Sequence, residues 1–461
     1  MNSENKLKQE TIVNHLKNYG FVYPGSEIYG GLSNTWDYGP VGVLLKNNIK
    51  HLWWKEYVTK QGNSVGLDSS IILNPQVWKA SGHLTNFSDP LIDCKQCRNR
   101  FRVDKLIEEK LNIHVSEGAT FEELEKIIHD NHLVCPVCGK EDWTEIRKFN
   151  LMFKTYQSVL QDASSEVYLR PETAQGIFIN FMNAQRTSRM KLPFSICQIG
   201  KAFRNEITPG NFIFRTREFE QMECEHFCYP DYADTAFEEQ LDKVKNFVNN
   251  ILKFKPENVR LFEHPKDDLS HYSKRTVDIE YNFPHGFSEL WGVAHRGNYD
   301  LTCHQKESKA NIWYLDEKTN TKLIPFVIEP SVGVDRLFYA IACDTYEEQD
   351  LGNNDKRVVM HFTYELAPYK VAVLPLVNKL SAQAYEVFKS LIDKDISATF
   401  DTSGSIGKRY RRQDAIGTYY CITFDYDSLN DQKVTIRNRD TMQQERIEIK
   451  QIFNYLNNIN K

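Results

Sequence analysis

The chain has 461 residues, of which 41% are hydrophobic, so it can bury a sizeable core and suggests about three domains at roughly 150 residues each. Its formal net charge of −5 excludes a globally basic surface, and any nucleic-acid binding must come from local patches. The polar N-terminus predicts no secretory signal and no later run resembles a membrane span. We therefore expect a cytoplasmic protein with mostly reduced cysteines.

The N-terminal region predicts a helix followed by a strand. Pro40 stands where a first helical residue is favoured, and apolar residues then recur at helical spacing to about Lys60. A strand is expected over residues 65–73, ending at Pro75. On spacing alone, ordinary core packing explains this unit better than a functional role.

Two Cys-x-x-Cys pairs, Cys94/Cys97 and Cys135/Cys138, lie within a distinct segment, residues 88–148, and bracket a charged helical stretch. Four thiolates satisfy a tetrahedral zinc ion, so the pairs predict a structural zinc site with no open position. The main alternative is four reduced cysteines without metal, and a disulfide pair is less favoured.

Arg170 and Glu172 flank a proline in the sequence YLRPETAQG, just before a helix expected over residues 177–185. At the end of a strand, such a pair could bind a ligand or form a structural ion pair. From these residues alone, the structural alternative is favoured.

Residues 196–227 predict two strands joined by a turn at Thr208–Asn211. The first strand is largely apolar, whereas the second alternates acidic and apolar residues, which would place carboxylates on one face. Arg204, Arg215 and Arg217 lie near the predicted tip. The pair therefore suits a ligand that carries both signs of charge, and a solvated hairpin edge is the alternative.

Further strands are expected over residues 276–283, 288–301 and 323–328. Glu289 lies inside the second of them, where a charge is rare without a partner. The third ends in the sequence EPSVGVDR, and a helix begins there. Arg336 would oppose the dipole of that helix unless it faced an anion, so it is a functional candidate.

Residues 345–358 are polar and turn-rich, and Ala367-Pro368 suggests a domain boundary. The remainder predicts an α/β domain with a mixed sheet. Its strands are expected at residues 370–374, 398–401, 419–424 and 433–437, and its helices at residues 380–392, from 406, and within 448–456. A basic run, Lys408–Arg412, surrounds an aromatic residue and suits single-stranded RNA, although a solvated helix face is equally compatible.

Together these segments resemble a class II aminoacyl-tRNA synthetase, specifically the homodimeric glycyl-tRNA synthetase family. The resemblance runs from the sequence FVYPGSEIYGGL through the C-terminal domain. The segment 40–75 resembles motif 1, which builds the dimer interface in the family. Phe203–Glu206 with Arg215 and Phe219 fits motif 2. Ser331–Arg336 resembles motif 3, with serine in place of a usual glycine and Asp335 in place of a usual glutamate.

The resemblance implies an α+β catalytic domain over residues 1–366, built on an antiparallel sheet flanked by helices. A zinc-ribbon-like subdomain would be inserted at residues 88–148. An anticodon-binding α/β domain would follow over residues 367–461. The implied partners are glycine, ATP with Mg²⁺, tRNA(Gly) and a second copy of the chain.

The implied reaction attaches glycine to tRNA(Gly) through a glycyl-adenylate, without a side-chain nucleophile. Arg204 is expected to hold the α-phosphate, Phe219 to stack on adenine, and Glu206 to accept from the adenine amino group. Arg215 and Arg336 would hold the outer phosphates, and Glu289 would bind magnesium. The expected ATP contacts are Arg204, Asn205, Glu206, Phe214, Arg215, Phe219, Glu289, Leu290, Gly333 and Arg336, with Arg204, Arg336 and Glu289 as catalytic residues.

Glycine offers an ammonium and a carboxylate but no side chain, so a selective pocket must hold the ammonium and fill the remaining space. The expected glycine contacts are Arg102, Glu172, Gln221, Glu223, Glu329 and Ser331. The other strand glutamates, Glu218, Glu220 and Glu225, receive no role. The expected anticodon contacts are Lys408, Arg409, Arg411, Arg412, Arg437 and Arg439.

Two other functions are compatible with parts of the sequence. A catalytically inactive synthetase-like RNA-binding or accessory subunit would be expected to lose arginines from motifs 2 and 3, yet Arg204, Arg215 and Arg336 are present. A zinc-dependent RNA-binding module would fit the cysteine pairs and the basic run. It would leave the acidic positions unexplained.

Overall fold

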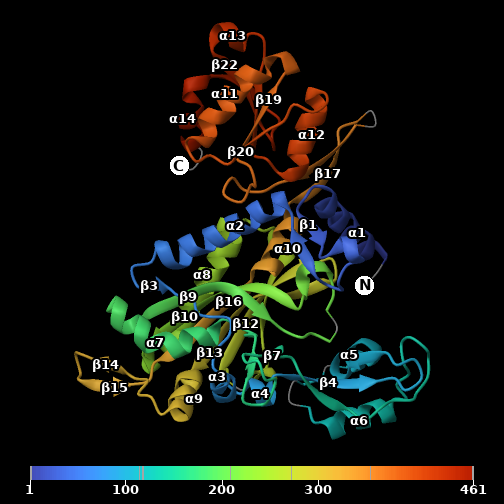
Figure 1. Cartoon of the computed structure of the whole chain (residues 1–461), viewed down its shortest axis with the longest axis vertical. Coiled ribbons are helices and arrows are strands. Elements are labelled where there is room, and N and C mark those ends of the chain that lie inside the picture. The colour runs from blue at the N-terminus through green and yellow to red at the C-terminus, as the bar shows by residue number, and fades with distance from the viewer. Residues whose placement is uncertain are drawn as a thin grey trace. The chain divides into compact units, whose positions relative to one another are not determined.

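The computed structural model describes residues 3–113, 115–116, 119–207, 209–270, 272–352 and 355–458 (Figure 1). The chain forms two compact units. The smaller unit comprises Met1–Glu27, Trp36–Leu52 and Phe338–Lys461, and the larger comprises Ile28–Thr35 and Trp53–Leu337. Among the described residues, no helix is both long enough and apolar enough to cross a membrane.

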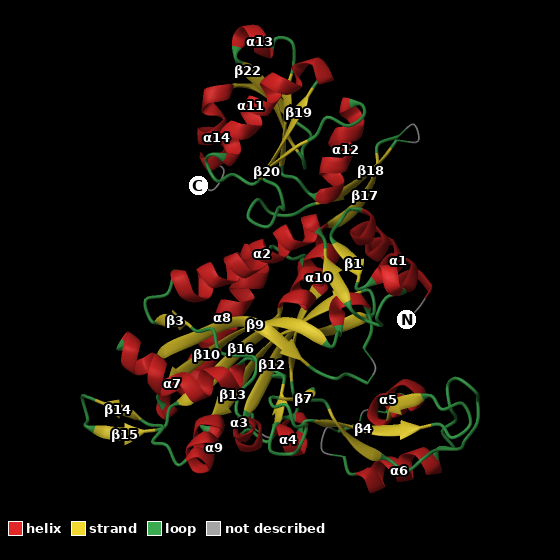
Figure 2. Ribbon diagram, viewed as in Figure 1, coloured by secondary structure: helices red, strands yellow, loops and turns green. Residues whose placement is uncertain are grey.

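A seven-stranded sheet forms the centre of the larger unit (Figure 2). Its order is β11-β12-β13-β16-β10-β9-β3, and neighbouring strands run antiparallel except that β3 runs parallel to β9. The predicted antiparallel sheet is confirmed. The strands are β3 (Ser64–Gly66), β9 (Phe194–Phe203), β10 (Glu218–Cys228), β11 (Val259–Glu263), β12 (Arg275–Phe283), β13 (Gly286–Gly297) and β16 (Phe326–Gly333).

Helices cover both faces of this sheet. On one face, Phe181 of α7 (Ala174–Ser188) packs with Phe227 of β10, their ring centroids 4.6 Å apart. On the other, Phe247, in the π-helical continuation of α8 (Ala233–Asn246), packs against Trp291 of β13. The face that α7 covers also carries the odd-numbered residues of β10, because side chains alternate along a strand.

Two predicted strand boundaries next to helices are wrong. The expected strand at 65–73 is reduced to β3, and Pro75 begins helix α3 (Pro75–Ala80). Asn74 caps that helix, since its side-chain oxygen accepts a hydrogen bond from the Gln76 amide at 2.9 Å. The strand expected to reach residue 301 ends at Gly297, because α9 (Tyr299–Ser308) follows.

Two further differences concern residues around α10 (Val334–Thr345). Strand β16 begins only at Phe326 but continues through Gly333, so most of the EPSVGVDR sequence is strand. In the polar, turn-rich segment, strands β17 (Tyr346–Asp350) and β18 (Lys356–Met360) pair antiparallel, and the sequence analysis expected neither strand. The predicted hairpin of β9 and β10 is confirmed, although Thr208 of its turn lies outside the described residues.

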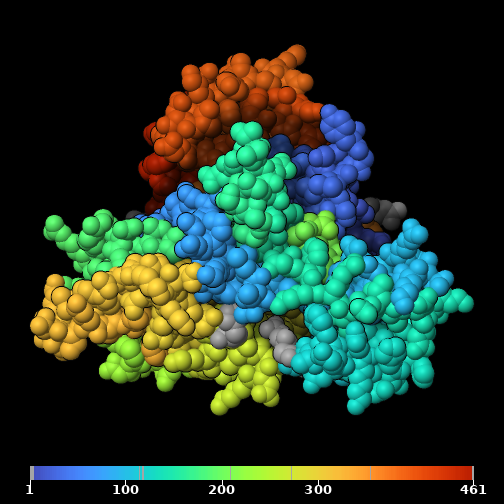
Figure 3. All heavy atoms as spheres, turned by 60° about the horizontal axis from the view of Figure 1, so that its bottom comes forward, coloured from blue at the N-terminus to red at the C-terminus, as the bar shows by residue number. Residues whose placement is uncertain are grey.

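The segment 88–148 has its own sheet and core. Strands β4 (Ser88–Asp93), β5 (Arg100–Arg102) and β6 (Arg147–Asn150) pair in the order β5-β4-β6. Helices α5 (Val103–Leu111) and α6 (Phe121–Asp130) pack apolar side chains against it. We call this segment the insert, and Figure 3 shows its atoms, in cyan, gathered in one lobe.

A mixed five-stranded sheet lies in the C-terminal part of the smaller unit, as predicted. Strands β20 (Ala398–Phe400), β19 (Val371–Pro375) and β21 (Tyr420–Phe424) are parallel, and β22 (Lys433–Asn438) and β23 (Gln444–Glu448) continue it antiparallel. The exposed edge strand β23 was not predicted, because its sequence is short and polar. The helices are α11 (Ser381–Ile392), α12 (Ile406–Ile416), α13 (Ser428–Asp431) and α14 (Ile452–Asn458).

The remaining elements are peripheral to these sheets. Helix α2 begins at Pro40, as predicted, and a π-helical turn continues it to Thr59. The other helices and strands are α1 (Ser3–Asn18), β1 (Val22–Pro24), β2 (Trp36–Tyr38), α2 (Pro40–Trp54), α4 (His83–Asn86), β7 (Lys154–Tyr156), β8 (Glu166–Tyr168), β14 (Tyr314–Asp316) and β15 (Thr321–Leu323).

A buried ion-pair cluster links the hairpin β17–β18 to the C-terminal sheet. The Asp414 carboxylate accepts a hydrogen bond from Arg357 at 2.8 Å and two from Arg437 at 2.8 and 3.1 Å. All three side chains are buried. Removing the carboxylate would leave two guanidinium groups without their counter-ion in the interior, which is far more costly than losing a surface pair.

We therefore expect Asp414→Ala to lower the free energy of unfolding of this sheet by roughly 3–5 kcal/mol. The urea dependence of amide hydrogen exchange in peptides from β21 and β22 measures this loss. Asp431→Ala breaks an exposed pair with Arg446 and serves as the matched control, for which little change is expected. Equal protection in the two variants would contradict the assigned role of Asp414.

Candidate active site

A cavity of about 290 Å³ opens on the face of the seven-stranded sheet that carries the odd-numbered residues of β10. Residues from β10, β12, β13, β16 and the start of α10 line it together with the connection between β9 and β10. It brings together most of the residues predicted for ATP and glycine, namely Glu172, Arg204, Glu206, Phe214, Arg215, Phe219, Gln221, Glu223, Glu289, Leu290, Glu329, Ser331, Gly333 and Arg336.

Strand register explains why residues distant in sequence meet here. Glu223 of β10 lies opposite Ser331 of β16, which lies opposite Gly292 of β13, which lies opposite Asp278 of β12. Directly opposed residues share a face, so these four side-chain positions form one row across the sheet. The glycine in this row leaves open space in front of the sheet.

The predicted single face of carboxylates on β10 is wrong. Glu223 and Glu225 lie on the cavity side, whereas the even-numbered Glu218 and Glu220 lie on the other side, because side chains alternate. The exposed Glu218 pairs with Lys201 at 2.6 Å. Strand parity therefore divides the glutamates that the sequence pattern had grouped together.

Guanidinium groups gather at one end of the cavity. The Arg336 Nη1 atom lies 2.9 Å from the Glu289 carboxylate, and its guanidinium stacks 4.4 Å from the ring centre of Phe214. Arg204 lies 5.3 Å from the ring centre of Phe219 and donates to the Pro171 carbonyl at 3.0 Å. These arginines line one cavity together with Glu206 and Glu289, and their clustered guanidinium groups suit an anionic ligand.

The electrostatics of Arg215 indicate the same preference. Burial lowers the pKa of its guanidinium, and the nearby positive charge of Arg336 lowers it further, while Glu206 opposes the shift. The pKa of Glu289 shows the opposite effect of Arg336. Burial would raise this pKa, but the positive charge of Arg336 holds it below the usual value. An added anion would relieve the repulsion between the arginines.

Carboxylates occupy the other end. Glu223 is buried and accepts hydrogen bonds from the Thr173 amide at 3.0 Å and from Ser331 Oγ at 2.9 Å. Gln221 also donates to it, at 3.0 Å. Glu172 accepts a hydrogen bond from Gln175 at 2.9 Å. A small cation between Glu223 and Glu172 would find oxygen acceptors from both.

The pKa values of these two glutamates move in opposite directions. Burial, followed by the negative charge of Glu172, raises the pKa of Glu223. Burial alone would raise that of Glu172 too, but His83 and Arg296 hold its pKa below the usual value. The pair therefore has one readily ionised member and one that gains from a nearby positive charge.

Several important residues escaped the sequence analysis. Arg296 is buried and donates to the Asp300 carboxylate at 2.8 and 3.0 Å and also to Glu329. Thr173 donates through its amide and its hydroxyl to Glu223. The sequence offered one signal for Arg296, namely that it is a charged residue inside a predicted strand. The same kind of signal had identified Glu289.

Arg170 neither pairs with Glu172 nor lines the cavity. It donates to the carbonyls of Lys201 and Ser69, which joins two segments beside the site. A Cβ atom at Gly200 would lie 2.2 Å from the Arg170 guanidinium, so a larger residue there would have to displace that group from its hydrogen bonds. The unusual Asp335 of the third motif also has a structural contact, since its carboxylate accepts from the Glu220 amide at 2.8 Å.

Two predicted contacts lie outside the cavity lining. Arg102 is held by Asp89 at 3.1 Å and by Asp104, at the junction of β5 and α5. The amide of Asn205 donates to the Leu151 carbonyl at 2.7 Å. Arg102 nevertheless lies close enough to Glu206 of the cavity lining for their charges to interact.

The four insert cysteines meet at one point. The sulfur atoms of Cys94, Cys97, Cys135 and Cys138 all lie within 4.8 Å of one another. Cys94 and Cys138 have their sulfur atoms 3.5 Å apart, and Cys97 and Cys135 have theirs 3.6 Å apart. A tetrahedral zinc ion with Zn–S bonds of about 2.3 Å separates its sulfurs by about 3.8 Å, so the donor set fits zinc.

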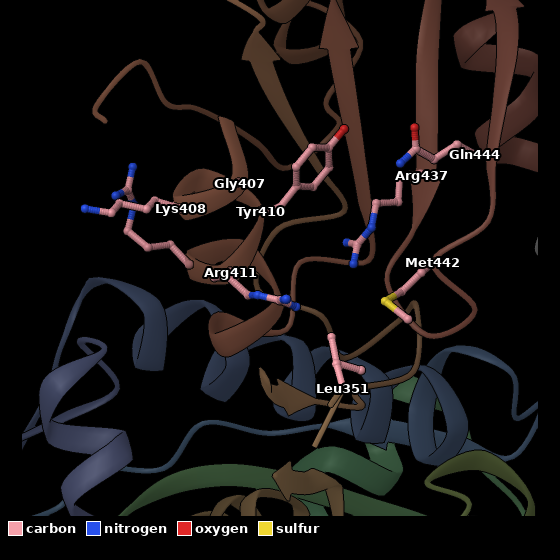
Figure 4. A pocket seen from close by; sticks show the side chains of 9 residues that line it. Leu351, Gly407, Lys408, Tyr410, Arg411, Arg437, Met442 and Gln444 are labelled. Atoms are coloured by element: carbon pink, nitrogen blue, oxygen red, sulfur yellow. The ribbon is translucent and has the colours of Figure 1, made fainter. Parts of the chain in front are cut away.

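A second cavity, of about 610 Å³, lies in the smaller unit beside α12 (Figure 4). Lys408, Arg411, Arg412 and Arg437 line it with Tyr410, and the Arg437 guanidinium lies 5.0 Å from the Tyr410 ring centre. In Figure 4 the Lys408 side chain extends away from the sheet.

Burial corrects the predicted anticodon contacts. Arg409 is 2% exposed and donates to the Gly404 and Pro375 carbonyls. Arg439 is equally buried and donates to the carbonyls of Gly417 and Phe362. These two arginines stabilise the fold, and RNA cannot reach them without disrupting it.

Comparisons with known proteins agree with this geometry. Residues 370–459 match the family model "Anticodon binding domain", and residues 113–151 match "Glycyl-tRNA synthetase insertion domain 1". A solved structure titled as the RNA binding domain of threonyl-tRNA synthetase from Cryptosporidium parvum shares the fold, with a TM-score of 0.65 over 98% of each chain at 17% identity. The chain therefore has an aminoacyl-tRNA synthetase-like α+β fold with an anticodon-binding domain.

Curated relatives cover nearly the whole chain. The glycine–tRNA ligase of Ureaplasma urealyticum serovar 10 is 60% identical over 98% of this chain and 97% of its own length. That of Clostridium beijerinckii is 56% identical over 97% of both. At this identity and coverage, and with the motif residues gathered in one cavity, the chain belongs to the glycyl-tRNA synthetase family, whose curated members are named glycine–tRNA ligase.

Proposed function

We propose that the protein activates glycine with ATP and attaches it to tRNA(Gly). The observation that carries this proposal is one cavity with arginines and aromatic rings at one end and buried carboxylates at the other. ATP brings phosphates and a purine, and glycine brings an ammonium group. The two ends match these two substrates in charge and place them side by side.

At the arginine end, Arg204 would hold the α-phosphate, where negative charge develops as the glycine carboxylate attacks phosphorus. Phe219 would stack on adenine and Glu206 would accept from its amino group. Arg215 and Arg336 would hold the outer phosphates. Phe214, Leu290 and Gly333 line the same space and would complete the nucleotide site. Positioning and electrostatics supply the catalysis, since no side-chain nucleophile is required.

Magnesium would enter with ATP. The Glu289 carboxylate lines the cavity and lies 2.9 Å from Arg336, which fits a hard cation that also binds phosphate oxygens. Arg336, which now pairs with Glu289, would then bind a phosphate group of ATP instead. Mg²⁺ bound there would neutralise charge on the outer phosphates.

At the carboxylate end, Glu223 and Glu172 would hold the glycine ammonium, with Ser331 and Gln221 fixing the geometry of Glu223. Glu329 closes the floor beneath them. Exclusion of larger amino acids would require the side chains around the bound glycine to leave no room for a further substituent. Arg102 and Asn205, which flank the cavity lining, are further candidate contacts.

The catalytic proposal is tested by glycine-dependent exchange of labelled pyrophosphate into ATP. We expect exchange by the full chain and a fall of about 100- to 1000-fold in Arg204→Ala, because a donor to the transition-state charge is removed. Arg186→Ala, an exposed arginine on α7, is the matched control and should retain full exchange. Absence of exchange by the folded wild-type protein would instead favour an inactive synthetase-like subunit.

We also propose that the insert is a zinc-ribbon-like subdomain. Its four-cysteine cluster supports this role, because the sulfur separations fit tetrahedral zinc and the two pairs join both ends of the insert. Bound zinc would be structural, since all four ligands come from the protein.

Elemental analysis of the purified full chain should give about one zinc per chain. Cys97→Ser should reduce the zinc content, because three thiolates bind the ion less tightly than four. Cys303→Ser, a cysteine outside the cluster, is the control and should retain the metal. Wild-type protein without zinc would refute the proposal.

For domain organisation, we propose a catalytic domain over residues 1–366, which contains the insert, and an anticodon-binding domain over residues 367–461. The family match at residues 370–459 supports the second assignment. Helix α2, which resembles motif 1, supports a homodimer. A cytoplasmic location fits the role in protein synthesis.

The cavity beside α12 is the proposed anticodon surface. Lys408, Arg411 and Arg412 would contact phosphates and Tyr410 could stack on a base, while Arg437 lines the interior of the cavity. Arg411 and Arg412 now pair with Asp355 and Asp401, so RNA phosphates would compete with these carboxylates.

Lys408→Ala and Arg411→Ala should each raise the KM for tRNA several-fold, because each variant gives up a cation that faces an RNA phosphate. The slope of the salt dependence should fall by about 1 for each phosphate that the variant no longer neutralises. Glycine-dependent pyrophosphate exchange should not change, because the cavity of the larger unit is intact. Lys389→Ala, an exposed lysine on α11, is the control. A KM for tRNA equal to that of the wild type in both variants would rule out this surface.

A further inference from the structure

Glu225 has no place in the proposed chemistry, yet it is fully buried beneath the glycine end of the cavity. It lies two residues along β10 from Glu223, on the same face of the sheet. Neither of its carboxylate oxygens has a hydrogen-bond partner among the residues that the structure describes. A buried polar group in this condition requires an explanation.

Strand register places a second carboxyl group directly beside it. Glu223 lies opposite Ser331 and His226 lies opposite Ile328, so Glu225 lies opposite Glu329. Glu329 is also buried, at 7% exposure. Two ionised carboxylates in opposed positions within a sheet repel each other, and burial makes the repulsion stronger.

The surroundings offer one fixed positive charge. Arg296 of β13 donates to Glu329 and twice to Asp300 of α9, and its guanidinium lies 3.9 Å from Glu172. The other titratable groups around the pair are Glu223 of β10, His83 of α4, His304 of α9 and Tyr272, which stacks on Arg296 at 3.8 Å. Among the described residues around this pair, carboxyl groups therefore outnumber fixed cations, and one proton between Glu225 and Glu329 removes one of the uncompensated negative charges.

The pKa directions agree with this geometry. Burial, and then the charge of Glu329, raise the pKa of Glu225 well above its usual value. Burial raises the pKa of Glu329 to about 8, although Arg296 opposes the rise. Near neutral pH, the pair therefore retains a proton in the absence of a further positive charge.

We propose that Glu225 and Glu329 share one proton in the free enzyme and release it to solvent when the glycine ammonium group enters the pocket. This inference rests on the proposed function of the cavity as a glycine site. The ammonium, held by Glu223 in the adjacent row, supplies the positive charge that stabilises the newly ionised carboxylate. The O–H bond of one carboxyl breaks and its proton passes to buffer. The new carboxylate charge is offset locally by the ammonium group, while the glycine carboxylate lies toward the arginine end of the cavity.

Proton release makes glycine affinity depend on pH in a defined direction. Because the bound state has the lower carboxyl pKa, acid favours the free enzyme. The Kd for glycine should rise by about tenfold for each unit that the pH falls below about 8, the pKa of Glu329, until the bound-state pKa is reached. Glycine itself retains its ammonium charge throughout this range and contributes no proton.

Titration calorimetry of the full chain with glycine, at pH 7 in buffers of different ionisation enthalpy, counts the protons. We expect the wild type to release about one proton for each glycine bound. Glu225→Gln should release close to none, because Glu329 is then already ionised and paired with Arg296. Glu218→Gln, on the opposite face of the same strand, is the matched control and should behave as the wild type.

The outcomes separate this inference from the proposed function. Binding of glycine by the wild type without proton release, or equal release by wild type and Glu225→Gln, would overturn the shared proton. Failure of the wild type to bind glycine, together with absent pyrophosphate exchange, would overturn the proposed function instead. If Glu225→Gln does not fold, two measurements on the wild type still test the shared proton. These are the proton release in the buffer series and the pH dependence of the Kd for glycine.

Discussion

The buried guanidinium group of Arg296 is the interaction on which the carboxylate end of the site depends. It connects β16 through Glu329 to α9 through Asp300. Without this cation, several carboxyl groups would remain in a poorly solvated place with no counter-charge, at a cost of several kcal/mol. The acidic pocket and the arginine beneath it therefore form one electrostatic unit, and neither would be stable alone in its present form.

The seven-stranded sheet makes that unit possible because its register is fixed. Rows of opposed residues on β10, β16 and β13 convert positions separated by a hundred residues into direct neighbours. A shift of one residue in any strand would send its polar side chains into the layer packed by α8 and its apolar ones into the cavity. The large aromatic residues on the α8 face, such as Trp291, oppose such a shift.

Much of the fold and the motif residues followed from sequence. Strand alternation and helical spacing located the main elements, and most residues expected to contact ATP or glycine line one cavity. The ion-pair partners of the charged side chains could not be predicted from the sequence, because they depend on which residues are neighbours in three dimensions. Arg296 and Asp300 meet across a strand–helix junction, and strand parity separates Glu218 from Glu223. The basic run suggested exposure, yet Arg409 within it is buried, since composition does not distinguish a solvated arginine from one bonded to carbonyls.

The insert leaves and re-enters the larger unit at one place. Ser88 of β4 lies opposite Asn150 of β6, so the two ends of the intervening chain are adjacent, and the cysteine pairs join it again a few residues further on. The apolar residues of α5 and α6 are internal to the insert. A segment joined in this way can be lengthened, shortened or exchanged without altering the strands that carry the cavity. The insert is thus a module with a core of its own.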